Sequence, residues 1–190
     1  MKKEFQKRLL SSFVLIPLSL FFIVKGKLFF NFFLIVCFFV TCYEWFMMSK
    51  KKKYHLFGYI FLFFSFYSAY ALRHNFGNES LIIFMLIIIT CISTDIGGYI
   101  FGNLFKGPKL IKISPKKTYS GMIGSFLMPL IIIYLLINNS NFFYNEYKEF
   151  TNELLFIILS ISTISQIGDI LISYFKRLSK IKDTGKIIPG

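Results

Sequence analysis

Long apolar stretches, separated by short polar segments, make up most of the chain. About 20 consecutive apolar residues cross a bilayer as a helix, and an open strand cannot satisfy its backbone hydrogen bonds in lipid. The pattern therefore predicts an all-α, polytopic membrane protein with about six transmembrane helices. We expect these helices at residues 9–24, 28–48, 56–72, 81–102, 122–137 and 153–172.

The first apolar stretch, 9–24, follows four basic residues and could be mistaken for a signal peptide. No small-residue cleavage site follows it, so we expect a retained helix that pairs with the second one. We expect one integral membrane domain over the whole sequence. It comprises N-terminal helices at 1–80 and helices carrying the candidate chemistry at 81–190, with a basic loop at 103–121 and a polar tail at 173–190.

The composition supports the membrane class and excludes two others. Hydrophobic residues make up 55% of the chain and charged residues only 16%, and the mean hydropathy is +0.63. Soluble domains carry about 25% charged residues. A soluble globule could not bury this much apolar surface, and a disordered chain would not contain it.

Basic residues give the orientation. Of the 22 Lys and Arg residues, 18 fall in the N-terminal tail, the 49–55 loop, the 103–121 loop and the C-terminal tail, and four fall in the alternate loops. The positive-inside rule therefore places both termini in the cytoplasm. The formal net charge of +13 would raise nucleic acid as a partner in a soluble chain. Here the bases lie between apolar runs, so we expect anionic headgroups or phosphate substrates and no nucleic acid.

Three acidic residues lie inside the predicted spans, where a charge is costly. Glu44 is near a helix end and close to Lys50–Lys53, so snorkelling accounts for it. Asp95 and Asp169 lie within two turns of the cytoplasmic ends of their helices, where the two basic segments emerge. We expect these carboxylates to converge, and they either neutralise lysines or bind a metal.

The 103–121 loop contains the run Ser114-Pro-Lys-Lys-Thr118. A turn at Ser114-Pro115 would present Lys116, Lys117 and Thr118 together. Two ammonium groups and neighbouring hydroxyls suit a polyphosphate, but a lysine-rich cytoplasmic loop also adheres to anionic lipid headgroups, so both interpretations stay open. Upstream, Gly98 and Gly102 are spaced for helix packing, and Gly97 could let the backbone approach a ligand.

Polar residues near the C-terminus share one helical face. Asp169, Ser173 and Lys176 are spaced by four and three residues, and Arg177 falls on the same side. This face carries a carboxylate, a hydroxyl and two cations, and it extends from the membrane into the cytoplasm. Such an arrangement suits a metal-bound polyphosphate.

At these residues the chain resembles the phosphatidate cytidylyltransferases, also called CDP-diacylglycerol synthases. Their C-terminal signature begins S-x-[apolar]-K-R-x4-K-D-x-[small]-x2-[apolar]-[PGS], and it is matched at Ser173, Phe175, Lys176, Arg177, Lys182, Asp183, Gly185, Ile188 and Pro189. The run Ser114 to Gly121 and the preceding D-x-G-x-Y-x-x-G, Asp95 to Gly102, are also similar to the family. The specific resemblance covers residues 95–190.

The resemblance implies transfer of a cytidylyl group from CTP to phosphatidic acid in phospholipid biosynthesis, with Mg²⁺ as cofactor, in a multi-pass protein of the cell membrane, with a bacterial inner membrane expected. Membrane lipids are further expected partners, and a homodimer stays open. The implied roles are metal binding for Asp169 and Asp95, and catalysis for Lys176, Arg177, Lys182 and Asp183. Substrate binding is implied for Ser114, Lys116, Lys117, Thr118 and Ser173.

The sequence departs from the family at its end. It stops at Gly190, before the H-G-G-x-x-D-R-x-D part of the signature, which carries two more aspartates of the implied metal centre. We expect an incomplete site on that account, whether the sequence is a fragment or the product of a broken gene. Two other functions stay open: a CTP-dependent kinase of polyprenol-type lipids, and a non-catalytic transporter or scaffold in which Asp95 and Asp169 serve as ion sites.

Overall fold

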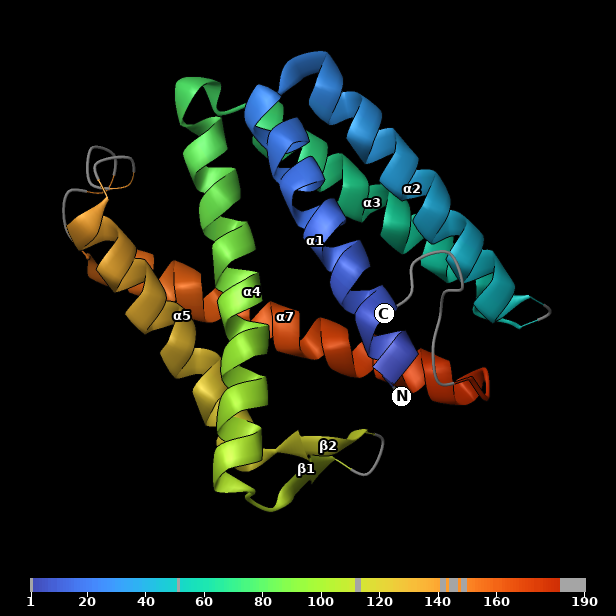
Figure 1. Cartoon of the computed structure of the whole chain (residues 1–190). Coiled ribbons are helices and arrows are strands. Elements are labelled where there is room, and N and C mark those ends of the chain that lie inside the picture. The colour runs from blue at the N-terminus through green and yellow to red at the C-terminus, as the bar shows by residue number, and fades with distance from the viewer. Residues whose placement is uncertain are drawn as a thin grey trace. The chain divides into compact units, whose positions relative to one another are not determined.

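The structure is a computed structural model that describes residues 2–50, 52–111, 114–140, 143, 147 and 150–181, with side chains from residue 13 onward except at 78, 111 and 114–116. Helices dominate this part of the chain (Figure 1). They are α1 (Lys2–Lys25), α2 (Lys27–Ser49), α3 (His55–His74), α4 (Ser80–Phe105), α5 (Tyr119–Asn139) and α7 (Asn152–Leu178). A short 3-10 helix, η1 (Gly77–Glu79), precedes α4.

Five of the described helices (α2, α3, α4, α5 and α7) are long and apolar enough to span a membrane. The remaining helix, α1, contributes a shorter apolar stretch, Phe13–Lys25. Large apolar side chains such as Phe39 and Phe156 are more than 60% exposed, which suits contact with lipid and not with water. The predicted all-α, polytopic membrane class is confirmed. The cytoplasmic placement of the termini stays a prediction.

A small hairpin interrupts the helices between α4 and α5. Strands β1 (Lys109–Ile111) and β2 (Ser114–Thr118) pair antiparallel, with Lys109 opposite Thr118 and Ile111 opposite Ser114. The predicted turn at Ser114-Pro115 is therefore wrong, because both residues lie in β2. Proline is tolerated there because each strand of a two-stranded sheet is an edge strand, which leaves some backbone N–H groups without a ladder partner.

The chain forms two compact units. The first comprises Met1–Leu81 together with Leu178–Gly190, and the second comprises Ile82–Arg177. The expectation of one integral membrane domain over the chain stays a prediction.

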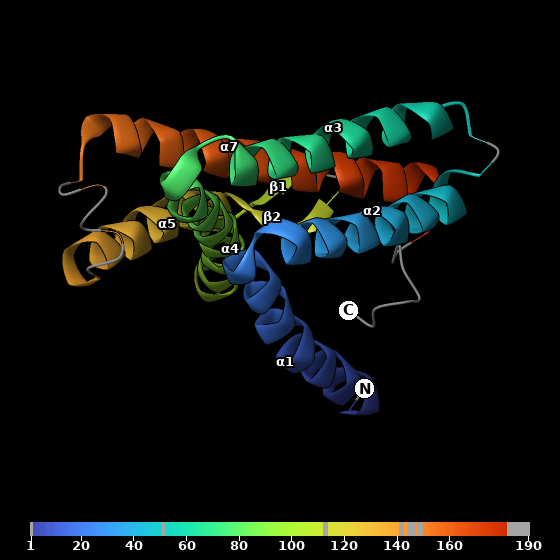
Figure 2. The ribbon, with the colours of Figure 1, turned by 90° about the horizontal axis from the view of Figure 1, so that it is seen from above.

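In the first unit, α2 and α3 run side by side, and α1 turns away from α2 at Gly26 (Figures 1 and 2). Gly26 has a φ of 61°, a left-handed conformation that glycine adopts without steric cost. The guanidinium of Arg73 donates hydrogen bonds to the carbonyl oxygen of Ile23 at 3.3 Å and to the Ser80 hydroxyl at 2.8 Å. The bonds to Ile23 tie the end of α3 to the end of α1, and the bond to Ser80 ties it to the start of α4.

In the second unit, α4, α5 and α7 share an apolar core. Leu86 of α4, Ile133 and Ile137 of α5, and Leu154 and Ile158 of α7 are all buried there. These residues lie in the first half of α4, the second half of α5 and the first half of α7, so the core occupies one end of the three-helix unit. The opposite end of the unit carries the β1–β2 hairpin and most of the polar side chains described below.

Candidate functional site

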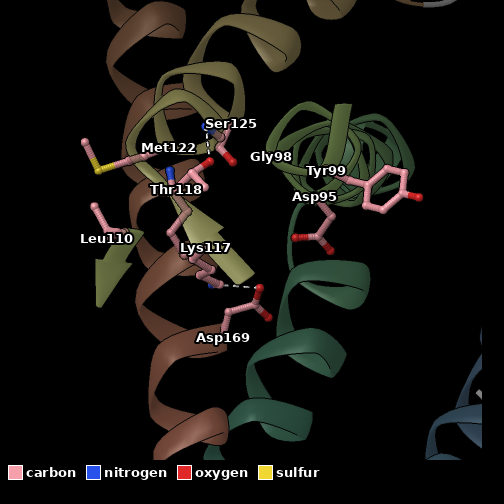
Figure 3. A pocket seen from close by; sticks show the side chains of 11 residues that line it. Asp95, Gly98, Tyr99, Leu110, Lys117, Thr118, Met122, Ser125 and Asp169 are labelled. Atoms are coloured by element: carbon pink, nitrogen blue, oxygen red, sulfur yellow. Dashed lines mark hydrogen bonds and ion pairs between the residues drawn. The ribbon is translucent and has the colours of Figure 1, made fainter. Parts of the chain in front are cut away.

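A pocket of about 290 Å³ opens at the hairpin end of the second unit (Figure 3). Residues of three helices and both strands line it, and all of these elements except β1 contribute polar or charged side chains. The lining residues are Asp95, Gly98 and Tyr99 of α4, Leu110 of β1, Lys117 and Thr118 of β2, Gly121, Met122 and Ser125 of α5, and Gln166 and Asp169 of α7.

Glycines allow α4 and α5 to approach closely beside the pocket. A Cβ atom added at Gly97 would collide with the carbonyl oxygen of Gly124 and lie 2.7 Å from the Cβ of Met128. A Cβ at Gly121 would lie 2.8 Å from the carbonyl oxygen of Gly98. Small residues at such positions are typical of packed membrane helices. A Cβ at Gly98 would lie 2.6 Å from the Ser125 Oγ, and one at Gly102 would lie 3.7 Å from the Cα of Gly121, so the predicted packing role of these two glycines is confirmed. Approach of a ligand to Gly97 stays a prediction.

A buried hydrogen bond fixes α4 against α7 next to Asp95. The Thr94 hydroxyl is 3.0 Å from the Ser162 hydroxyl, and it also donates to the backbone carbonyl of Thr90 at 2.8 Å. Thr94 and Ser162 are both buried. Because Thr94 immediately precedes Asp95, this contact helps to set where the Asp95 carboxylate emerges from α4.

The first turn of α5 is capped beside the pocket. Thr118 ends β2 and is the N-cap of α5: its hydroxyl accepts a hydrogen bond from the backbone N–H of Gly121 at 3.2 Å. The Ser120 hydroxyl lies 3.0 Å from that of Thr118 and accepts a hydrogen bond from the backbone N–H of Gly107 at 3.3 Å. The positive end of the α5 dipole therefore lies at the pocket, where it favours an anion.

Lys117 and Asp169 form an ion pair across the pocket. The Lys117 Nζ donates a hydrogen bond to the Asp169 Oδ2 at 3.1 Å, so the two side chains form a salt bridge (Figure 3). The side chains are 27% and 57% exposed, so an incoming ligand can reach both groups. An exposed pair of this kind contributes roughly 0–1 kcal/mol to stability, which makes a purely structural role for it weak.

The two carboxylates predicted to converge both face this pocket. Asp95 extends from α4 toward the space in which Asp169 meets Lys117 (Figure 3). Gln166, one turn before Asp169 on α7, lines the same pocket, and its side-chain nitrogen is buried without a hydrogen-bond partner in the described part of the chain. A buried unpaired donor is costly, and a phosphate oxygen in the pocket would satisfy it.

These residues fit a magnesium ion that is shared with a substrate. Within the described ranges no group of three His, Cys, Asp or Glu side chains could hold a metal by itself. Magnesium usually keeps several waters and is bound through one or two carboxylates plus substrate phosphates. Asp95 and Asp169 supply two carboxylates, and the Lys117 ammonium group and the N-terminus of α5 beside them suit phosphate.

The other predicted site residues lie outside the pocket lining or outside the described residues. Ser173, Lys176 and Arg177 belong to α7, one to two turns beyond Asp169, and do not line the pocket. Ser114 and Lys116 lie in β2, but their side chains are outside the described set, as are Lys182 and Asp183 altogether. Sequence reasoning missed Gln166, although an amide inside an apolar span, three residues before an aspartate, was a usable signal.

Replacing Gly97 with alanine is expected to destabilise the site. The added methyl group forces α4 and α5 apart, and overpacking of this kind costs about 1–3 kcal/mol. We expect the apparent Tm of the purified protein in detergent to fall by several degrees. Gly168→Ala on α7 is the matched control, because a Cβ there meets nothing within 4 Å. Equal Tm values for the two variants would contradict the close approach of α4 and α5.

Comparison with known proteins identifies the family. The sequence model of the cytidylyltransferase family matches residues 6–76 and 55–190. A phosphatidate cytidylyltransferase of Rickettsia felis is 35% identical over 193 residues, which cover 100% of this chain and 84% of the relative. The corresponding protein of Rickettsia typhi is 34% identical over 194 residues, covering 100% of this chain and 83% of the relative. One from Haemophilus influenzae is 37% identical over 115 residues, 59% of this chain and 39% of the relative.

No solved structure matches the chain significantly. The family match and the relatives nevertheless extend well beyond residues 95–190, so they include the N-terminal helices that resembled the family only in being hydrophobic. With most of the chain matched by the family model, and with relatives about 35% identical along its whole length, the chain belongs to the cytidylyltransferase family.

Proposed function

We propose that this protein is a phosphatidate cytidylyltransferase, a membrane nucleotidyltransferase that makes CDP-diacylglycerol from CTP and phosphatidic acid. Relatives of that name match the chain from end to end, which supports the proposal. The observation that carries it is the pocket in which Asp95, Asp169 and Lys117 meet at the N-terminus of α5.

The reaction requires positioning and charge neutralisation more than covalent catalysis. An oxygen of the phosphatidate phosphate attacks the α-phosphorus of CTP. The bond between that phosphorus and the oxygen bridging to the β-phosphate breaks, and pyrophosphate leaves with the electron pair. Both substrates are anionic, so the site must hold several negative charges close together.

The described pocket offers groups for each task. We assign Lys117, the Thr118 hydroxyl and the first turn of α5 to the phosphates of CTP, because an ammonium group and a helix N-terminus both favour anions. The Gln166 amide would donate to a phosphate oxygen. Asp95 and Asp169 would hold Mg²⁺, which when bound would neutralise charge on the phosphate oxygens. The Lys117–Asp169 pair keeps both groups oriented before substrates arrive.

The remaining residues of the signature extend the site along α7. We assign Lys176 and Arg177, in the last turn of α7, to the polyphosphate, with Ser173 between them and Asp169. Ser114 and Lys116 of β2 would add to the phosphate-binding wall. Lys182 and Asp183 would close the cytoplasmic edge of the site. These roles follow the motif matches of the sequence.

The protein is a multi-pass membrane protein, and its family implies nucleotide and lipid substrates. We place it in the bacterial cell membrane, since the relatives named above are bacterial proteins. A homodimer stays a prediction.

The position of the transferred phosphorus tests the proposed function. Membranes that contain the protein are incubated with Mg²⁺, phosphatidic acid and CTP labelled with ³²P at the α- or the γ-phosphorus. We expect the α label to appear in lipid and the γ label to appear in pyrophosphate. Membranes from the same host without the protein's gene are the control. Lipid labelled only from the γ position would identify a CTP-dependent lipid kinase, and no transfer from either position would point to a transporter or scaffold.

A further inference from the structure

A tightly bonded polar cluster fixes the turn between α2 and α3 in the first unit. The Ser49 hydroxyl is buried, lies 2.6 Å from the carbonyl oxygen of Trp45 and is 2.7 Å from the Nδ1 of His55. In return, the Trp45 indole N–H donates to the carbonyl oxygen of His55 at 2.8 Å. Since the single Ser49 proton serves the Trp45 carbonyl, His55 donates from Nδ1 to Ser49.

The Trp45 indole ring holds α3 close to α2. A Cβ atom at Gly58 of α3 would collide with this ring, so only glycine leaves room for it. The backbone N–H of Lys52 donates to the carbonyl oxygen of Ser49 at 2.9 Å, and that of His55 donates to the carbonyl oxygen of Lys52 at 3.1 Å. The last turn of α2 and the first turn of α3 therefore form one rigid corner.

Tyr54 stands on this corner and contacts the C-terminal segment. It immediately precedes α3, and its ring packs edge-on against the Trp45 ring with centroids 6.1 Å apart. Its hydroxyl lies 2.7 Å from the hydroxyl of Ser179, which is 125 positions away in the sequence. Because the ring is packed and the corner is rigid, the place of the hydroxyl is fixed before it meets Ser179.

Ser179 lies two residues after Arg177, in the segment that follows the basic pair assigned to the CTP phosphates. Lys176 and Arg177 occupy the last turn of α7, which ends at Leu178. The boundary between the two compact units falls between Arg177 and Leu178, so the chain joins the Tyr54 unit immediately after the basic pair. Lys and Arg side chains are long and flexible, and an anchor two residues beyond Arg177 restricts the backbone from which both extend.

We propose that Tyr54 is a positioning residue: through its hydrogen bond to Ser179 it holds the end of α7 so that Lys176 and Arg177 are presented to the phosphates of CTP. This inference rests on the proposed function. It gives the N-terminal hairpin, which carries none of the assigned site residues, a part in nucleotide binding. Without the anchor, only a fraction of molecules has the basic pair in place, so the apparent affinity for CTP falls to that fraction of its full value. Bound CTP draws the pair back, so the rate at saturation is kept.

Steady-state kinetics of the full protein in membranes test the anchor. For Tyr54→Phe we expect the KM for CTP to rise about three- to tenfold, the range that one neutral hydrogen bond supports. We expect kcat and the KM for phosphatidic acid to stay within about twofold. Ser179→Ala should behave in the same way, and Ser179→Thr, which keeps a hydroxyl, should restore the wild-type KM. The double variant Tyr54→Phe/Ser179→Ala should be no worse than either single variant, because both remove the same bond.

Tyr43→Phe on α2 is the matched control, since Tyr43 is more than half exposed and it loses the same hydroxyl. A wild-type KM for CTP in both Tyr54→Phe and Ser179→Ala would overturn the inference, as would effects that add in the double variant. A fall in kcat with an unchanged KM would also overturn it. Failure of the proposed function looks different, because the wild-type protein would then transfer no label from the α-phosphorus of CTP.

Discussion

Asp169→Asn is expected to reduce cytidylyl transfer at least about 100-fold while the protein still inserts in the membrane. The amide keeps the shape of the side chain but removes the charge that would hold Mg²⁺, and metal stabilisation of phosphoryl transfer contributes several kcal/mol. It also ends the ion pair with Lys117. Insertion should not suffer, because removing a charge from a span favours the membrane. Initial rates, divided by the amount of protein in the membrane, give the result.

Glu153→Gln is the matched control for this variant. Glu153 is an exposed acid in the first turn of the same helix, far along α7 from the pocket, and the same atoms change. We expect its activity to stay within about twofold of wild type. Near-normal activity of Asp169→Asn would refute the metal assignment.

Lys117→Met is expected to lower kcat/KM for CTP about 10- to 100-fold. Methionine keeps much of the apolar stem but removes the ammonium group, and a hydrogen bond to a charged group contributes about 1.5–3 kcal/mol. The loss leaves Asp169 without its partner at 3.1 Å. Lys109→Met, in β1 of the same hairpin, is the control, because Lys109 is exposed and does not line the pocket. Steady-state kinetics in membranes provide the comparison.

The double variant Lys117→Met/Asp169→Asn separates a structural ion pair from a substrate site. If the two residues only neutralise each other, each single variant leaves one unpaired charge, and the double variant leaves none. Activity of the double variant would then return toward wild type. If each residue holds part of the substrate, the double variant is at least as inactive as Asp169→Asn. We expect the second outcome. Recovery of activity would reduce the pair to a structural contact.

Most of the helical architecture could be predicted from the sequence, because the length of each apolar stretch determines whether it can span the membrane as a helix. The predicted span 56–72 lies within α3, and 81–102 lies within α4. The helices extend further than the apolar runs, since hydrogen bonding along a helix continues into the polar interface. In α7 this extension brings Ser173, Lys176 and Arg177 into the last turns.

The hairpin could not be predicted from local pattern. Its strands have three and five residues, and a run such as Ser-Pro-Lys-Lys-Thr has low strand propensity. Pairing with Lys109–Ile111 supplies the hydrogen bonds that local preference does not. The correction matters for the site, because β2 leads directly into Thr118 and the first turn of α5.

The candidate site was predictable in its members more than in its arrangement. Charged residues inside apolar spans identified Asp95 and Asp169, since their burial in lipid needs a reason. The pairing of Lys117 with Asp169 joins residues 52 positions apart, and it depends on how α4, α5 and α7 are rotated against one another. Contacts such as Gly97 on Gly124 set that rotation, and a sequence pattern gives no angle for it.

Equilibrium binding of labelled CTP to the purified protein, measured with and without Mg²⁺, tests the account most directly. Wild-type protein should bind CTP much more tightly when Mg²⁺ is present. Asp169→Asn should bind CTP weakly and respond little to Mg²⁺, while Glu153→Gln should behave as wild type. An Asp169→Asn protein that binds CTP with the wild-type dependence on Mg²⁺ would contradict the assignment of this pocket as the metal and nucleotide site.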